Sequence, residues 1–189
     1  MEKLRIKHLE RFKLFEKQKS EIRRLWNVDT ESAQLLFFLL KAKNANNVLE
    51  VGTSNGFSTF IMSLAVNNNC MIETIEVDEK RYQMAIKNLC GLENIKQYFG
   101  KAEDIIPSLT NDYDFVFIDA NKKAYIDYIN LIMPKLNDNA IIVADNICSH
   151  CETTKLYQNF IKNDNRFTTM LLNHEAGFMI SLFKKVFDF

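Results

Sequence analysis

The sequence is poor in the residues that mark fibrous or disordered proteins. Its 189 residues include only five Gly and two Pro, which excludes a collagen-like repeat and a low-complexity chain. It has no long uncharged apolar run, and its first residues, MEKLRIKHLERFK, are charged throughout. Neither a signal peptide nor a membrane partner is therefore expected. Only four Cys occur, and without a secretion signal they are expected to be reduced thiols of a cytoplasmic protein.

An overall excess of charge is also absent, because 24 Lys and Arg balance 24 Asp and Glu. No global field therefore favours nucleic acid. The balance is uneven, since residues 1–24 hold nine Lys and Arg against four Glu, which is +5, and the rest of the chain carries −5. We predict a helical N-terminal arm over residues 1–29, followed by one domain over residues 30–189. The basic arm is compatible with a phosphate-binding surface, a homodimer contact or a solvated lid.

The arm is expected to be interrupted. Its apolar residues recur at loosely helical spacing, but residues 16–21 are all polar or charged, which indicates two helices or a break. A further helix is predicted over residues 30–43, with Thr30 as its N-cap residue.

Short apolar runs then alternate with helical patterns. Strands are predicted at residues 46–51, 70–77, 95–99, 113–119, 139–145, 167–173 and 178–185. Apolar strands separated by helices favour a parallel sheet covered on both faces. Only residues 174–177 join the last two strands, which is too short for a crossover, so this pair should be antiparallel. The predicted fold class is α/β, a doubly wound, seven-stranded, mostly parallel sheet with one reversed strand near an edge.

A glycine-containing loop follows the first strand, where sheets of this kind bind ligands. Gly52 and Gly56 allow close approach of a ligand to the backbone, and a helix is expected to begin at about Phe57. The dinucleotide fingerprint G-x-G-x-x-G is absent, because Ser54 and Phe57 occupy its other glycine positions. A pyrophosphate is therefore disfavoured. Glu50, two residues before the first glycine, suits a cationic ligand.

Carboxylates end three of the predicted strands. Glu76 ends the second, where it can accept both hydroxyls of an unphosphorylated ribose. Asp119 ends the fourth, with Lys122 three residues later, and Asp145 ends the fifth, followed by Asn146. Singly, such residues are most often loop residues or helix caps. At one edge of a parallel sheet they bring two carboxylates and an amide together, a set that suits a hard divalent cation such as Mg²⁺ or Mn²⁺.

Two stretches carry a resemblance to a known family. VLEVGTSNGFST at residues 48–59 and TIEVDE at residues 74–79 resemble motifs of class I S-adenosylmethionine (SAM)-dependent methyltransferases. They are most similar to the metal-dependent catechol and caffeoyl-coenzyme A O-methyltransferases, and WNVDTESAQLL, from Trp26, resembles that group's approach to the first strand. The resemblance covers about residues 26–186 and implies a Rossmann-like methyltransferase fold with SAM as cofactor.

The resemblance also implies roles for single residues. The catalytic residue would be Lys122, and the metal ligands would be Asp119, Asp145 and Asn146. Glu50 would lie near the amino group of the cofactor, Val28 and the two glycines beside its methionine part, Glu76 on the ribose, and Ala102 and Glu103 beside the adenine. The full set implied for the cofactor is Val28, Glu50, Gly52, Ser54, Gly56, Ser58, Glu76, Val77, Ala102, Glu103 and Asp119.

The function expected from this resemblance is metal-dependent methyl transfer from SAM to one hydroxyl of a small catechol-like acceptor. The alternatives are methylation of a hydroxylated nucleoside in tRNA, approached through the basic arm, and cofactor binding without turnover. Ala176 precedes Gly177 where the family usually has an acidic residue, which bears on the acceptor; Glu175 is a possible substitute. Cys148 and Cys151 lack a second ligand pair for zinc, and their loop is expected to line the acceptor pocket.

Overall fold

The computed structural model describes residues 6, 8–22, 25, 27–173 and 176–185. Within them, one seven-stranded sheet has the order β3-β2-β1-β4-β5-β7-β6. Its strands are β1 Asn47–Val51, β2 Met71–Glu76, β3 Ile95–Phe99, β4 Tyr113–Ile118, β5 Leu136–Ala144, β6 Phe167–Leu172 and β7 Phe178–Phe183. Neighbours pair in parallel except β7, which is antiparallel to both β5 and β6. The predicted fold class is confirmed, including the antiparallel final pair.

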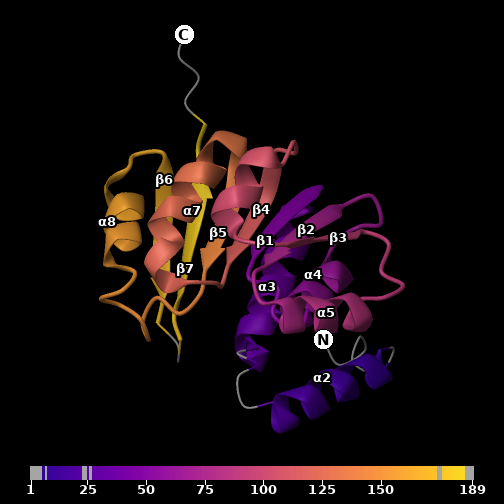
Figure 1. Cartoon of the computed structure of the whole chain (residues 1–189). Coiled ribbons are helices and arrows are strands. Elements are labelled where there is room, and N and C mark those ends of the chain that lie inside the picture. Colours follow the sequence, from indigo (N-terminus) through magenta and orange to yellow (C-terminus); the bar gives the residue numbers. More distant parts are fainter. Residues whose placement is uncertain (1–5, 7, 23–24, 26, 174–175, 186–189) are drawn as a thin grey trace.

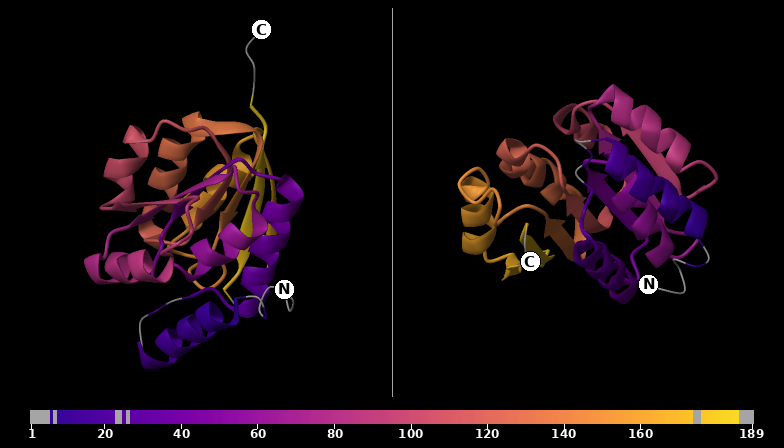
Figure 2. Two further views of the ribbon diagram at one scale, coloured as in Figure 1. Left: turned by 90° about the vertical axis from the view of Figure 1, so that its right-hand side faces the viewer. Right: turned by 90° about the horizontal axis from the view of Figure 1, so that it is seen from below.

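Helices cover both faces of this sheet (Figures 1 and 2). They are α2 Leu9–Glu21, α3 Thr30–Lys43, α4 Phe57–Ala65, α5 Glu79–Asn88, α6 Ala102–Ile105, α7 Tyr125–Ile132 and α8 Lys155–Asn163, with 3₁₀ turns at Ile106–Ser108, Lys122–Ala124 and Met133–Lys135. One apolar cluster joins the sheet to α3, α4 and α5, and the other joins it to α6, α7 and α8. No helix among the described residues is both long and apolar enough to cross a membrane.

The two central strands are buried from both sides, which is why their sequences are apolar almost throughout. Val48 and Leu49 of β1 and Phe115 and Val116 of β4 are all fully buried. Consecutive residues of a strand point to opposite faces, so each pair contributes to both apolar clusters. The carboxyl ends of β1, β2, β4 and β5 open at one edge of the sheet, where Glu76, Asp119 and Asp145 lie.

Two local expectations are wrong. The arm helix is not interrupted within residues 16–21, because α2 runs unbroken from Leu9 to Glu21 with Phe12 and Phe15 on its buried face. The N-cap residue of α3 is Asp29 and not Thr30, since the Asp29 carboxylate accepts hydrogen bonds from the backbone N–H of Ser32 at 2.7 Å and from its hydroxyl at 3.0 Å.

Helix α2 lies outside the three layers, at the end of the molecule where α3, α4 and α5 meet (Figures 1 and 2). Its buried residues pack on α4, with the Phe15 ring centroid 5.3 Å from that of Phe57 and 5.6 Å from that of Phe60. The arm is thereby placed next to the loop that joins β1 to α4.

Candidate active site

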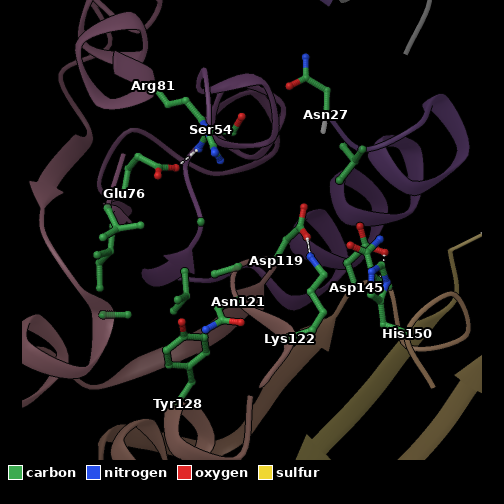
Figure 3. A pocket seen from close by; sticks show the side chains of 18 of the residues that line it. Asn27, Ser54, Glu76, Arg81, Asp119, Asn121, Lys122, Tyr128, Asp145 and His150 are labelled. Atoms are coloured by element: carbon green, nitrogen blue, oxygen red, sulfur yellow. Dashed lines mark hydrogen bonds and ion pairs between the residues drawn. The ribbon is translucent and has the colours of Figure 1, made fainter. Parts of the chain in front are cut away.

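A cavity of about 860 Å³ lies beyond the carboxyl ends of β1, β2, β4 and β5, a volume in the range usual for small-molecule sites. Predicted residues that line it are Val28, Gly52, Ser54, Glu76, Val77, Ala102, Asp119, Lys122, Asp145 and Asn146. Figure 3 shows Ser54 and Glu76 at one end, and Asp119, Lys122 and Asp145 at the other. The residues predicted to bind a nucleoside and the residues predicted to bind a cation therefore line the same cavity.

The loop from Gly52 to Gly56 is held close to the ends of β2 and β4. The backbone N–H groups of Gly52 and Thr53 both donate to the carbonyl of Ile75, at 3.0 and 3.2 Å. Gly52 has a φ of +106°, and a Cβ at this position would lie 2.1 Å from the backbone oxygen of Asp119. Only a glycine fits here without displacing the backbone that carries Asp119.

Glu76 supports the same loop from the end of β2. One of its carboxylate oxygens accepts the backbone N–H of Ser54 at 2.7 Å, and the other accepts that of Asp78 at 2.8 Å. The residue is 4% exposed. Because each carboxylate oxygen accepts more than one hydrogen bond, Glu76 retains acceptor capacity for hydroxyl groups of a ligand in the cavity.

Glu50 lies behind the loop and is absent from the residues that line the cavity. It is fully buried and accepts hydrogen bonds from the hydroxyls of Ser58 (2.5 Å), Thr59 and Thr74 (2.6 Å). Burial raises its pKa to about 7, although the three hydroxyls oppose this shift. Glu50 therefore cross-links β1, β2 and the first turn of α4. Gly56, Ser58 and Glu103 are also absent from the cavity wall, and their assignment to the cofactor stays a prediction.

The ends of β4 and β5 bring two carboxylates and an amine together. The Lys122 Nζ atom lies 2.8 Å from the Asp119 Oδ1 atom, and the two side chains are 17% and 14% exposed. Asp145 is 4% exposed, and one of its oxygens accepts the backbone N–H of Asn146 at 2.5 Å. Burial, and next the negative charge of Asp119, raise the pKa of Asp145 to about 7, while Lys122 opposes the shift.

The hydroxyl of Tyr125 ties these two strand ends to each other. It donates to the carbonyl oxygens of Ile118 at 3.2 Å and of Asp145 at 3.0 Å. Since Tyr125 is fully buried, the link is shielded from water. It holds the backbone that carries both carboxylates in a fixed register.

The donor set at these strand ends fits a divalent cation. Asp119, Asp145 and Asn146 present only oxygen donors from their side-chain carbonyl and carboxylate groups, which hard cations prefer. Burial and the negative charge of Asp119 raise the pKa of Asp145, and Lys122 opposes the shift, so a further positive charge beside the two carboxylates would favour their charged forms. Among the described residues, no group of three or more His, Cys, Asp and Glu side chains forms a metal-binding cluster; the proposed set contains only two such residues.

Several residues of the wall were missed by the sequence reasoning. They are Lys19, Asn27, Asp29, Val51, Ile75, Arg81, Gly100, Ala120, Asn121, Lys123, Tyr128, His150 and Thr153. Asn27 and Asp29 flank the predicted Val28, and Arg81 lies in the first turn of the helix that follows Glu76, so a search of sequence neighbours would have found these three. Lys19 belongs to α2 and carried no local signal. His150 and Thr153 come from the loop expected to line the acceptor pocket.

The turn before β7 also reaches this wall through Ala176. The Ala176 carbonyl accepts the backbone N–H groups of Cys148 at 2.9 Å and Ser149 at 3.1 Å, and a Cβ at Gly177 would lie 2.2 Å from the Cys148 sulfur. The turn and the loop after Asn146 are thus packed as one unit. Trp26 and Glu175, which the sequence reasoning also considered, lie outside the described residues.

A family model described as O-methyltransferase matches residues 5–180. The chain belongs to this O-methyltransferase family. Among its relatives, a catechol O-methyltransferase of Niastella koreensis is 35% identical over 128 residues, covering 64% of this chain and 58% of that protein. A caffeoyl-CoA O-methyltransferase 2 of Populus trichocarpa is 31% identical over 133 residues, covering 64% and 54%. The chain thus aligns with little more than half the length of these relatives.

Solved structures of O-methyltransferases agree with the fold described above. An O-methyltransferase from Bacillus cereus in complex with SAH has a TM-score of 0.85 at 19% identity, covering 92% of this chain and 90% of that one. The O-methyltransferase TomG from Streptomyces achromogenes, in complex with SAM, has a TM-score of 0.82 at 22% identity, covering 89% and 86%. At these identities the likeness establishes the shared fold alone.

Proposed function

We propose that this chain transfers the methyl group of SAM to a hydroxyl oxygen of a small catechol-like acceptor, with a divalent cation at the site. The observation that carries the proposal is that one cavity contains both Glu76 and the group formed by Asp119, Lys122 and Asp145. Transfer from a nucleoside cofactor to a hydroxyl needs a ribose anchor and a proton acceptor side by side. Relatives named catechol and caffeoyl-CoA O-methyltransferase support the reaction and the acceptor class.

Binding of the nucleoside part is assigned to Glu76 and its surroundings. The two backbone N–H groups that it accepts fix the orientation of the carboxylate before a ligand arrives. Ribose hydroxyls would then meet a charged acceptor that needs no rearrangement. Val77 and Ala102 line the same part of the cavity and supply apolar contacts for a base.

Asp119, Asp145 and Asn146 would hold the cation. When bound, a divalent cation stabilises the negative charge that develops on a hydroxyl oxygen, by several kcal/mol. These three protein ligands cannot fill the six positions of a hard cation, which leaves room for two adjacent oxygens of an acceptor. This geometry favours vicinal hydroxyls over a single hydroxyl.

Lys122 is the proposed general base. A phenolic hydroxyl has a pKa of about 10 and is mostly protonated at pH 7. In its neutral form the Lys122 amine accepts that proton, and Asp119, at 2.8 Å, stabilises the ammonium that results. The remaining contribution is orientation, because the site holds the acceptor oxygen and the methyl donor at fixed positions. His150, beside Asp145 in Figure 3, lines the side of the cavity where the acceptor would lie.

The test is a methyl-transfer assay with labelled SAM. The acceptors are a panel of catechols and, in parallel, undermodified tRNA, each with Mg²⁺ and with chelator. We expect cation-dependent methylation of at least one catechol, and loss of that activity in Asp145→Asn. Methylation of tRNA without methylation of catechols would overturn the acceptor class, and unchanged activity in chelator would overturn the role of the cation.

A further inference from the structure

Three amide side chains connect the arm helix to the loop that follows β1. The Gln18 Oε1 atom of α2 accepts from Asn55 Nδ2 at 3.0 Å and from Asn88 Nδ2 at 2.8 Å. The Gln18 Nε2 atom donates to Asn88 Oδ1 at 3.0 Å, and Asn88 Nδ2 also donates to the Asn55 backbone carbonyl at 2.8 Å. We call Gln18, Asn55 and Asn88 the amide triad.

Both asparagines of the triad are buried, and Gln18 is half-buried. Asn55 is fully buried and Asn88 is 4% exposed, while the Asn55 Oδ1 atom has no hydrogen-bond partner within the described part of the chain. The only side-chain partner shown for the Asn55 amide is therefore Gln18. Without Gln18, that buried amide would be left unsatisfied, and an unsatisfied buried polar group is strongly unfavourable.

Asn55 is also part of the candidate cofactor loop. Its neighbour Ser54 donates its backbone N–H to Glu76, the ribose anchor of the proposed site. Its other neighbour, Gly56, is the N-cap residue of α4 and has a φ of +88°. A shift of Asn55 toward water would therefore move the contact between Ser54 and Glu76.

Further contacts hold α2 against the same part of the molecule. The Arg11 guanidinium donates to the Cys90 carbonyl at 2.9 Å and lies 5.4 Å from the centre of the Phe60 ring. Phe15 packs on Phe57 and Phe60 of α4. The residue after Gln18, Lys19, lines the cavity itself. The arm thus contacts the cofactor loop through Gln18, and the helix that follows this loop through Phe15.

We propose that Gln18 is a positioning residue of the cofactor site, through which docking of α2 and binding of the cofactor are coupled. The inference rests on the proposed SAM site. With α2 docked, the triad holds Asn55, and the loop presents the Ser54 N–H to Glu76. By reciprocity, a ligand that needs the ordered loop stabilises the docked arm to the same extent.

The test is calorimetric titration of SAH, the demethylated cofactor, into the full-length chain and its variants. Gln18→Ala is expected to weaken SAH binding about 5- to 50-fold, within the range usual for coupled sites. Gln18→Glu keeps the acceptor for Asn55 and is expected to recover part of the affinity. Lys17→Ala is the matched control, because Lys17 is the neighbouring residue of the same helix and its side chain is 70% exposed; it should bind SAH as the unaltered chain does.

Hydrogen exchange supplies the second readout. SAH should slow exchange in both α2 and residues 52–56 of the unaltered chain, and this protection of α2 should be lost in Gln18→Ala. A residue that only stabilised the fold would lower the melting temperature and leave both readouts unchanged. Equal SAH affinity in Gln18→Ala and the unaltered chain would overturn the inference and leave the proposed function standing. Failure of the unaltered chain to bind SAH would overturn both.

Discussion

Replacement of Gly52 by alanine tests how closely the cofactor loop approaches the end of β4. A Cβ at this position would lie 2.1 Å from the Asp119 backbone oxygen and 2.7 Å from its carbonyl carbon. Both are backbone atoms, so no change of side-chain rotamer can relieve the overlap. Either the loop or the backbone that carries Asp119 must move.

Two effects contribute to the expected loss in the free energy of unfolding. An L-residue at the positive φ of Gly52, +106°, costs about 1–2 kcal/mol, and an overpacked contact costs about 1–3 kcal/mol. The free energy of unfolding of Gly52→Ala should therefore fall by about 2–5 kcal/mol. For a chain of this size that corresponds to a decrease in melting temperature of roughly 4–20 °C.

Gly91 provides a matched control for the backbone part alone. Its φ is +81°, and a Cβ there would have no atom within 4 Å. Gly91→Ala should lose only about 1–2 kcal/mol and should bind SAH unchanged, whereas Gly52→Ala should bind SAH at least about tenfold more weakly, equal to about 1.4 kcal/mol. Urea unfolding and SAH calorimetry measure both quantities. Equal loss of stability in the two variants, with SAH affinity retained in both, would refute the argument from close approach.

Four further predictions concern polar groups in and beside the site. Lys122→Ala should lower turnover by about 10²–10⁴-fold and leave SAH affinity in calorimetry nearly unchanged; full turnover would remove Lys122 as the base. Glu76→Ala should weaken SAH binding by about 1.5–3 kcal/mol, and an unchanged dissociation constant would contradict its assignment to the ribose. Tyr125→Phe should lower the free energy of unfolding in urea by about 1–2 kcal/mol, because the buried Asp145 carbonyl loses its hydroxyl donor while the Ile118 carbonyl keeps only the Asp145 N–H. The control, Tyr157→Phe, removes a buried hydroxyl that has no hydrogen-bond partner among the described residues and should lose no stability; similar losses in both variants would refute the reasoning. For Glu50, burial raises the folded-state pKa from the ordinary value of 4.5 to about 7, so the folded state keeps the carboxyl proton to higher pH than the unfolded state does. From pH 5 to pH 7 the free energy of unfolding of the unaltered chain should therefore fall by about 2 kcal/mol more than that of Glu50→Gln. An equal pH dependence of the two free energies, measured by urea unfolding, would contradict this.

The order of elements and the carboxylates at the strand ends could be predicted because both follow from local rules. Buried parallel strands are apolar runs that stop where the chain leaves the sheet, so polar residues just after them mark one edge. Glu76, Asp119 and Asp145 occupy such positions, and all three line the cavity. To predict that these three residues lie close together, it was enough to assume a parallel sheet.

The role of Glu50 could not be predicted in the same way. Its position beside the glycine loop suggested contact with a ligand, but its side chain belongs to the buried side of β1 and is enclosed by three hydroxyls. Two of those hydroxyls, from Ser58 and Thr59, belong to the first turn of α4. Which side of the loop a strand residue faces depends on the sheet that surrounds it, and no local pattern specifies this.

The amide triad had no sequence signal either. Gln18 is 37 residues from Asn55 and 70 from Asn88 along the chain, and amide side chains are mostly exposed in folded proteins. The sequence pattern alone therefore indicates a polar gap in the arm at residues 16–21. In the structure, the polar residues of this segment divide between an exposed face and Gln18, which makes the buried contact.

The charges of α2 also bear on whether this helix binds a polyanion such as tRNA. The helix contains four cations and three carboxylates, a net charge of +1, and Lys13 and Lys17 form ion pairs with Glu10 and Glu21. Binding of a polyanion requires several cations that can replace counterions on the phosphates, and cations already paired with carboxylates contribute less to it. The buried face of α2 instead provides Phe15, Gln18 and Arg11 to the loop and helices of the candidate cofactor site. Of the +5 carried by residues 1–24, the remaining +4 lies in the segments that flank α2. A steep salt dependence of tRNA binding would therefore have to arise in those segments, because α2 itself packs beside the cofactor loop.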